Sequence, residues 1–559
     1  MRIALPRGIT AAAVLYSSFL SAAQTPDQIL RDQQQQLDLQ RQELLKRPDI
    51  FAPLPKQTEQ APTSLPAQGP CFEIHHIALL NTPPAWQDWM THATAAIRGQ
   101  CMNVPKLQSL VQDLTNQLIA RGFVTSRVYL PEQNLKTGTL RLAVVPGRLG
   151  SIHLKDGSSD LSLRAAFPLT SGEILNVRAL EQGLEQLSRA RSQQATMEIV
   201  PGAEDGMSDV IITRQRGKPW TAAFSWDDSG QPSTGVQQGN ATLGIDNVIG
   251  INDALSLSWS QELGQLTDPR TRSDTLSWVL PWGNWTGMAS YSESAYHQLI
   301  QGSNQLLVSS GHSRNTFLSL SRLIDRDQFS KTEIALQLTR KASRSFIADA
   351  EILNQRRDLT ALGLELSHRR QWNSWQLDGA LAYSRELGLW GAMPNTLAAQ
   401  SGPSARAEIW TAHLNISSPF KLGQQNLRWS SEWRGQYSPN LLMGSEQFSI
   451  GSRYTVRGFN TTSLTGQSGW VLRNELGWAL LPPTSHGRTL DIFAGLDVGQ
   501  VARQTGSSWD TNTLSGWAAG LRATLCPGFT AELSHERALH QPTGWNRPAI
   551  THFRLAMQY

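Results

Sequence analysis

This sequence has little charge, little cysteine and no long apolar run beyond its N-terminal segment. Charged residues make up 17% of its 559 residues, the net charge is +4, and cysteine occurs three times. No run of five or six basic residues is present, so nucleic acid is not an expected partner. After the first 23 residues, no segment approaches the ~18 unbroken apolar residues that a membrane-spanning helix needs. If the protein lies in a membrane, it does not cross it with helices.

Signatures of catalysis and metal binding are also missing. The sequence contains no G-x-x-x-x-G-K-S/T phosphate loop, no H-E-x-x-H and no C-x-x-C. The adjacent pair His75 and His76 would point to opposite faces of a strand, which favours a structural role over a metal site. The segment GHSRN (311–315) lacks the second glycine of a nucleophile elbow. We therefore expect a protein that is not an enzyme and uses no cofactor.

The N-terminal region divides into three short segments. Residues 1–23 combine two arginines, a short apolar core and the small residues Ser-Ala-Ala, which predicts a cleaved signal peptide and export. Residues 24–48 predict a helix that begins at a Thr-Pro pair and ends at a proline. This helix is rich in glutamine and polar nearly all round, so it needs a wet surrounding or a polar cavity. Residues 49–70 are rich in proline and predict an extended linker.

The cysteines fit an exported protein. Cys71 and Cys101 flank one small segment, whereas Cys526 is remote from both. In an oxidising compartment the first two predict a disulfide, with two buried free thiols as the alternative. A closed loop of about 30 residues contributes roughly 3 to 4 kcal/mol in the chain-entropy model.

An internal repeat precedes a long alternating region. Residues 71–148 and 149–217 share the order βααββ, and each small sheet would leave one edge open. Residues 218–559 alternate polar and apolar side chains in about 16 segments, many long enough to cross a bilayer when tilted. Tryptophans recur near strand ends, as in LPWGNW (280–285), where membrane barrels carry aromatic girdles. We therefore favour a barrel of 16 antiparallel strands over a soluble sandwich, although a sandwich would alternate too.

Five segments in this order resemble a known family. They are RGFVTSRVYLPEQNLKTGTLRLAVVPGRL (121–149), LNVRALEQGLEQLSR (175–189), VRGF (456–459), WVLRNELGW (470–478) and FAGLDVGQV (493–501). Together with the layout of domains, they resemble the TpsB transporters of two-partner secretion. These are also called haemolysin secretion/activation proteins and belong to the BamA-like superfamily. The resemblance covers essentially the whole mature chain.

The resemblance implies a monomeric outer-membrane transporter of a Gram-negative bacterium. Two periplasmic POTRA (polypeptide-transport-associated) domains would capture an unfolded TpsA-type exoprotein by its N-terminal secretion domain. The client would be an adhesin, a haemolysin or a contact-dependent toxin, and the helix at 24–48 would plug the barrel at rest. The barrel-assembly machinery and periplasmic chaperones would act in biogenesis, and outer-membrane lipid would surround the barrel. The alternatives are a passive porin, a general barrel-assembly factor and a soluble secreted binding protein.

The resemblance also implies a site inside the barrel. The connection around 440–466 would fold back into the lumen and carry the VRGF motif there. An arginine in the lumen needs a carboxylate, and Asp497 matches the position of the partner in the family. Glu475 also points inward, and we expect it to pair with Arg473, two residues away. The motif residues are Val456, Arg457, Gly458 and Phe459.

The last strand resembles the family's barrel-assembly signal. Its apolar face ends in a tyrosine, where the family more often has phenylalanine. Both residues are aromatic, so recognition by the assembly machinery should survive. The residues of this face are Phe553, Leu555, Met557 and Tyr559.

Overall fold

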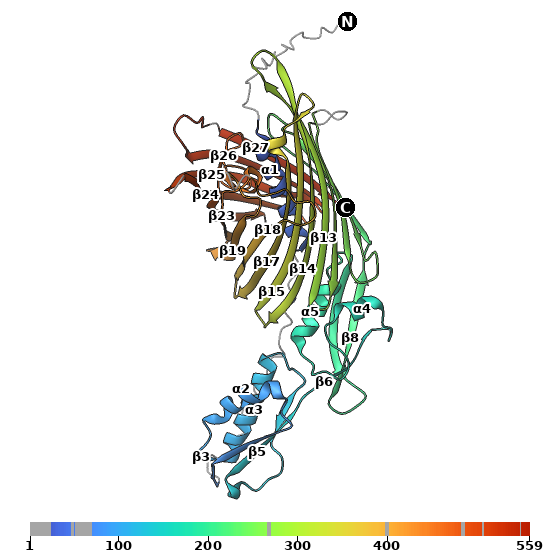
Figure 1. Cartoon of the computed structure of the whole chain (residues 1–559). Helices are drawn as coiled ribbons and strands as arrows, with labels where there is room; N and C mark the ends of the chain where they lie inside the picture. Colours follow the sequence, from blue (N-terminus) through green and yellow to red (C-terminus); the bar gives the residue numbers. More distant parts are fainter. Residues whose placement is uncertain are drawn as a thin grey trace, which may run out of the picture.

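The chain forms a closed barrel, two small domains at one end of it and one helix inside the barrel (Figure 1). The computed structural model describes residues 24–45, 50, 70–264, 270–396, 402–481, 487–505, 508–547 and 549–559. The predicted signal peptide (1–23) and almost all of the predicted linker (49–70) lie outside the described residues. Within them, no helix combines the length and the apolar character needed to cross a membrane.

The N-terminal helix α1 (Pro26–Leu45) lies within the barrel, as the glutamine-rich sequence required (Figure 1). Only Ile29, Leu37 and Arg41 are buried along its 20 residues. A helix of this length spans about 30 Å, which is close to the thickness of a bilayer core.

The first POTRA domain contains the predicted βααββ order with two additional short strands. A three-stranded sheet in the order β2-β5-β4 is covered on one face by two helices, and the additional strands β1 and β3 pair with each other. The Cys71–Cys101 disulfide forms beside that pair, with the two Cα atoms 5.4 Å apart. The elements are β1 (Phe72–Ile74), β2 (His76–Leu80), α2 (Pro84–Ala95), β3 (Gln100–Met102), α3 (Val104–Ala120), β4 (Arg127–Tyr129) and β5 (Thr139–Val145).

The second POTRA domain has the same βααββ order, without the additional pair of short strands. Its sheet has the order β6-β8-β7, with β6 and β8 parallel. Asp160 caps α4 by accepting a hydrogen bond from the Leu163 amide at 3.0 Å. The elements are β6 (Arg148–Leu154), α4 (Leu161–Ala166), α5 (Val177–Leu187), β7 (Gln193–Pro201) and β8 (Met207–Arg216).

Sixteen antiparallel strands close the barrel, which confirms the predicted fold class, and the two-residue strand β16 adds to one rim. Strands near the start of the barrel have eight or nine residues, whereas β13 to β15 have 17 to 21. The strands are β9 (Trp220–Asp227), β10 (Gln238–Asp246), β11 (Ala254–Glu262), β12 (Thr271–Trp282), β13 (Trp285–Gln301), β14 (Leu306–Arg326), β15 (Ser330–Ile347), β16 (Ala350–Glu351), β17 (Arg357–Trp372), β18 (Trp375–Leu387), β19 (Glu408–Leu422), β20 (Gln425–Tyr437), β23 (Ser468–Leu481), β24 (Thr489–Thr505), β25 (Ser508–Cys526), β26 (Phe529–His540) and β27 (Ala549–Gln558).

The seam of the barrel is the junction of β27 with β9. It contains five paired residues, whereas β27 pairs with β26 through nine. At one end of the seam Ala222 and Tyr559 exchange backbone hydrogen bonds of 3.1 and 2.8 Å. The Tyr559 hydroxyl also lies 2.5 Å from the Lys218 ammonium.

Candidate functional site in the barrel lumen

The connection between β20 and β23 folds back into the barrel. It contains a helical turn (Gly444–Glu446) and a small hairpin of β21 (Phe448–Ile450) and β22 (Leu464–Gly466). The VRGF motif lies at the tip of this hairpin. We call residues 440–466 the lumen loop.

Arg457 and Asp497 are brought together, as the family resemblance implied. Arg457 Nε lies 2.7 Å from Asp497 Oδ2, and Arg457 Nη2 lies 2.8 Å from Oδ1. The Arg457 backbone amide also donates to Oδ2, at 3.0 Å. The Asp497 side chain has no exposed surface and that of Arg457 is 4% exposed. The pair is therefore a buried, two-pronged ion pair that fixes the loop tip to β24.

The predicted Arg473–Glu475 pair is wrong. Glu475 Oε2 instead accepts from Arg457 Nη1 at 3.0 Å, and the same carboxylate binds Arg522 of β25. Arg473 lies directly across from Asp497 on the neighbouring strand. Arg473 and Glu475 lie two positions apart on one strand, and this spacing suggested that they pair. In the structure the lumen loop and β25 supply the two cations that bind Glu475.

Glycines make room for the loop tip against the barrel wall. A Cβ at Gly495 would lie 2.1 Å from Arg457 Nη2, and one at Gly516 would lie 1.9 Å from the Arg457 carbonyl oxygen. Gly458 itself has φ +92°, a conformation that favours glycine. Its amide donates to Glu536 Oε2 at 3.1 Å. The sequence analysis missed Glu536 and Arg522. The polar–apolar alternation of β26 and β25 places both side chains inside the barrel and could have indicated them.

The apolar residues of the motif hold the tip from its other side. Val456 is completely buried and Phe459 is 4% exposed. They belong to a cluster with Ile450, Val471, Val501, Leu514 and Ala538. Phe459 also meets Trp545, with the ring centroids 6.2 Å apart. The tip is therefore held by both charge and apolar packing.

Polar contacts hold α1 inside the barrel. Gln33 Oε1 accepts from Ser294 Oγ at 2.9 Å, and Gln34 Oε1 accepts from Asn315 Nδ2 at 2.7 Å. Arg31 Nη1 donates to the Gly444 carbonyl of the lumen loop at 2.5 Å. Apolar contacts add to these in the last turn, where Leu44 and Leu45 pack against three wall residues: Val279, Met288 and Phe317.

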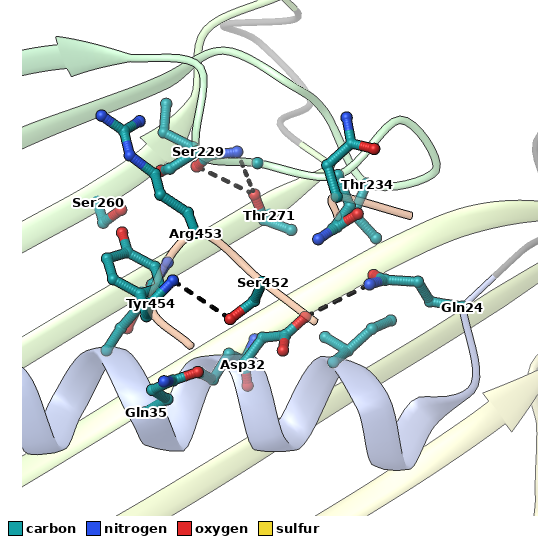
Figure 2. A pocket seen from close by; sticks show the side chains of 18 of the residues that line it. Gln24, Asp32, Gln35, Ser229, Thr234, Ser260, Thr271, Ser452, Arg453 and Tyr454 are labelled. Atoms are coloured by element: carbon teal, nitrogen blue, oxygen red, sulfur yellow. Dashed lines mark hydrogen bonds between the residues drawn. The ribbon is translucent and has the colours of Figure 1, made fainter. Parts of the chain in front are cut away.

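A small polar cavity remains between α1, the loop tip and the first barrel strands. Figure 2 shows Asp32 and Gln35 of α1 facing it from one side and Arg453 and Tyr454 of the loop from another. Its volume of about 100 Å³ holds a few waters. This space is too small for a polypeptide segment while α1 is in place.

The second POTRA domain is docked under the barrel through α5. Gln186 Nε2 donates to the Gly283 carbonyl in a barrel turn at 2.7 Å. Glu185 binds Arg326 at 2.9 Å and Lys331 at 3.1 Å. Burial would raise the pKa of Glu185, but the Lys331 charge and the Arg326 hydrogen bond hold it below its usual value. Ile50 joins this junction, because its backbone contacts both Glu185 and Arg326, at 2.9 and 2.6 Å.

The proposed assembly signal lies at the seam. Phe553, Leu555 and Met557 lie in β27, and Phe553 meets Trp226 of β9 at 4.9 Å between ring centroids. The Tyr559 ring centroid lies 5.4 Å from the Trp220 ring centroid.

The third cysteine, Cys526, is free and exposed.

Known proteins share this combination of domains and motifs. Residues 206–523, more than half of the chain, match the family described as haemolysin secretion/activation protein ShlB/FhaC/HecB. The chain belongs to the haemolysin secretion/activation protein family. Residues 72–147 match the ShlB-type POTRA domain, and residues 148–201 match a second POTRA family.

Relatives resemble this transporter over almost its whole length. Outer membrane transporter CdiB-2 of Burkholderia pseudomallei (strain 1026b) is 33% identical, covering 96% of this chain and 95% of the relative. Hemolysin transporter protein ShlB of Serratia marcescens is 27% identical, covering 92% and 93%. The solved structure of CdiB from Escherichia coli aligns with a TM-score of 0.85 and 28% identity, covering 96% of this chain and 100% of that one.

These matches confirm the predicted family, function and location. The chain is an outer-membrane transporter of two-partner secretion, and its POTRA domains lie in the periplasm. A porin and a general assembly factor do not fit these matches, because the relatives are named as transporters and align with this chain over almost their whole length.

Proposed function

We propose that this transporter secretes one large exoprotein in two stages, capture in the periplasm and passage through the barrel. The client would be a TpsA-type protein, captured unfolded through its N-terminal secretion domain. The polar contacts that hold α1 in the lumen support this best. Water and a passing backbone can replace the hydrogen bonds of α1, each worth only about 0.5 to 1.5 kcal/mol net, so the helix can leave. Folding of the client outside the cell would bias the direction without bond-making chemistry.

The outer face of the POTRA 1 sheet is the best candidate for capture. Leu80 of β2 and Tyr129 of β4 both lie beside Ala143 of β5, and they are 39% and 53% exposed. Val145 on the same face is 42% exposed. In the second repeat nearly all of α5 is buried beneath the barrel. The open sheet edges predict capture by residues 71–216, in the groove between the second helix and the second strand of each repeat. In the second repeat that groove is covered, because α5 is its helix, so POTRA 1 carries the accessible surface.

Binding of an unfolded secretion domain to the full-length transporter tests the capture site. Tyr129→Asp should weaken binding about fivefold, because it places a charge in an apolar contact. Val104→Asp is the matched control, since Val104 is also 53% exposed but begins helix α3 on the other side of the domain. Equal binding by both variants and the unaltered protein would remove the POTRA 1 sheet from the proposal.

Secretion itself is tested by searching beside this gene for a large exported protein with an N-terminal secretion domain, and by expressing that exoprotein with the transporter. Cells that express both proteins should display the exoprotein, and cells without the transporter should retain it in the periplasm. Display that continues without the transporter would refute the proposed client.

We further propose that the barrel-assembly machinery inserts the chain, with periplasmic chaperones keeping it unfolded until then. The terminal strand supports this, because its apolar face ends in an aromatic residue at the seam. The closed barrel also supports a monomer, since the pairing of β27 with β9 closes the sheet on itself and a second copy is not needed to complete it.

A further inference from the structure

The seam of the barrel is incomplete in its backbone pairing. Strand β9 ends at Asp227, opposite Arg554, whereas β27 begins earlier, at Ala549. The first residues of β27 therefore extend beyond their neighbour. An unpaired strand edge in a membrane barrel has to find other hydrogen-bond partners.

Directly after the end of β9, the side chain of Asp228 contacts β27. Its Oδ1 accepts the backbone amide of Phe553 at 3.0 Å, and its Oδ2 lies 3.2 Å from His552 Nδ1. The Asp228 and His552 side chains are 14% and 6% exposed. One carboxylate thus replaces one of the backbone contacts that a longer β9 would have made, and it adds a contact with the His552 ring.

The same carboxylate reaches the lumen loop. Arg453 lies four residues before Arg457, and its Nη1 lies 3.5 Å from Asp228 Oδ1. Arg453 Nη2 also lies 3.9 Å from Glu532 of β26. Figure 2 shows Arg453 projecting from the loop toward Ser229, which follows Asp228 in the chain.

A second contact runs from the lumen loop to β26, the strand that neighbours β27. Glu536 of β26 accepts the Gly458 amide at 3.1 Å and lies 3.9 Å from His552 Nε2. The loop tip is therefore tied to β24 by Arg457 and, separately, to two carboxylates, Asp228 and Glu536, that both contact β27. The first tie involves no residue of β9 or β27.

We propose that Asp228 is a positioning residue that joins the lumen loop to the seam, so that releasing Arg453 loosens the pairing of β9 with β27. This goes beyond the anchoring of Arg457 and does not depend on the identity of the client. The coupling is a property of the resting transporter, so its test needs no secretion. Failure of this inference and failure of the proposed function can therefore be told apart.

Hydrogen exchange of the seam strands in the purified full-length transporter tests the inference. Arg453→Ala should speed amide exchange in β9 and β27 about fivefold, as expected for the loss of one partly buried charged contact. Arg453 makes no backbone contact with either strand, so a purely local role would leave their exchange unchanged. Asp228→Asn should produce a similar increase, because the amide retains an acceptor for Phe553 but loses the charge.

A double variant and a matched control complete the test. Arg453→Ala combined with Asp228→Asn should exceed neither single change by much, because both remove the same contact. Asp378→Asn is the control, since Asp378 binds Arg369 at 2.6 Å on another part of the barrel. It should leave β9 and β27 unaffected. Normal exchange in the Arg453→Ala protein would overturn the inference, even if Asp228→Asn alone loosened the seam or failed to fold.

Discussion

Replacing Arg457 with alanine should detach the lumen loop and strongly reduce secretion. The substitution removes both guanidinium contacts from Asp497, whose side chain is completely buried. Removing one partner of a buried ion pair costs about 3 to 5 kcal/mol, because the remaining charge is left without compensation. Arg473 lies across from Asp497 and offsets part of this, which favours the lower end of the range. Since about 1.4 kcal/mol is a factor of ten, the detached population should rise roughly a hundredfold.

Three measurements on each variant would separate anchoring from folding. They are the amount of secreted exoprotein, proteolysis of the lumen loop, and heat-modifiable migration of the barrel. Arg457→Ala and Asp497→Ala should both lose secretion and expose the loop while the barrel stays folded. Arg457→Lys should restore secretion only in part, because lysine lacks the planar fork. Exchanging the two charges should recover part of the loss.

A lumen ion pair away from the loop is the matched control. Arg369 binds Asp378 at 2.6 Å, but the two side chains are 27% and 29% exposed. Arg369→Ala should therefore cost less than about 1 kcal/mol and leave secretion normal. Full secretion with a protected loop in the Arg457→Ala protein would show that this arginine does not anchor the loop.

Three further predictions concern the helix and the POTRA domains. Deleting residues 26–45 should raise single-channel conductance in planar bilayers, and unchanged conductance would contradict a plug. Replacing Cys71 and Cys101 with serine should destabilise POTRA 1 by roughly 3 kcal/mol in the chain-entropy model, measured by hydrogen exchange of α2 and α3. Burial would raise the pKa of Asp160, but hydrogen bonds from Arg214, Ser162 and the Leu163 amide lower it to about 2. Its stabilisation should therefore be complete above about pH 4 and disappear toward pH 2. Asp160→Asn should remove that pH dependence from the exchange of α4, and an unchanged profile would contradict this role.

Alternation explains why the barrel could be predicted from the sequence. A period of two assigns each strand residue to the lumen or the lipid side without any knowledge of its neighbours. Asp497 could be placed inside the barrel in this way, between Leu496 and Val498. The sequence predicts one strand over residues 71–80, which the structure divides into β1 and β2, and β3 was missed because three residues are too few to show a period.

Partners across the barrel could not be predicted in the same way. Glu475 was paired with Arg473 because both face inward two positions apart on one strand. Its real partners come from the lumen loop and from β25, which depends on strand order and on how deeply the loop folds back. Asp228 was missed for a related reason, since it lies just beyond a strand end, where alternation carries no information.

The short strands on one side of the barrel have a consequence for bilayer thickness. An eight-residue strand such as β9 is about 26 Å long, and at a tilt of about 40° it spans roughly 20 Å. The apolar band of outer-membrane barrels is about 25 Å tall. The lipid beside β9 must therefore compress by about 5 Å and the lipid beside the nine-residue β10 and β11 by about 2 Å, at a cost of fractions of a kcal/mol per Å. Strands β13 to β15 impose no such compression, so the transporter holds a wedge-shaped annulus of lipid whose thin side lies at the seam.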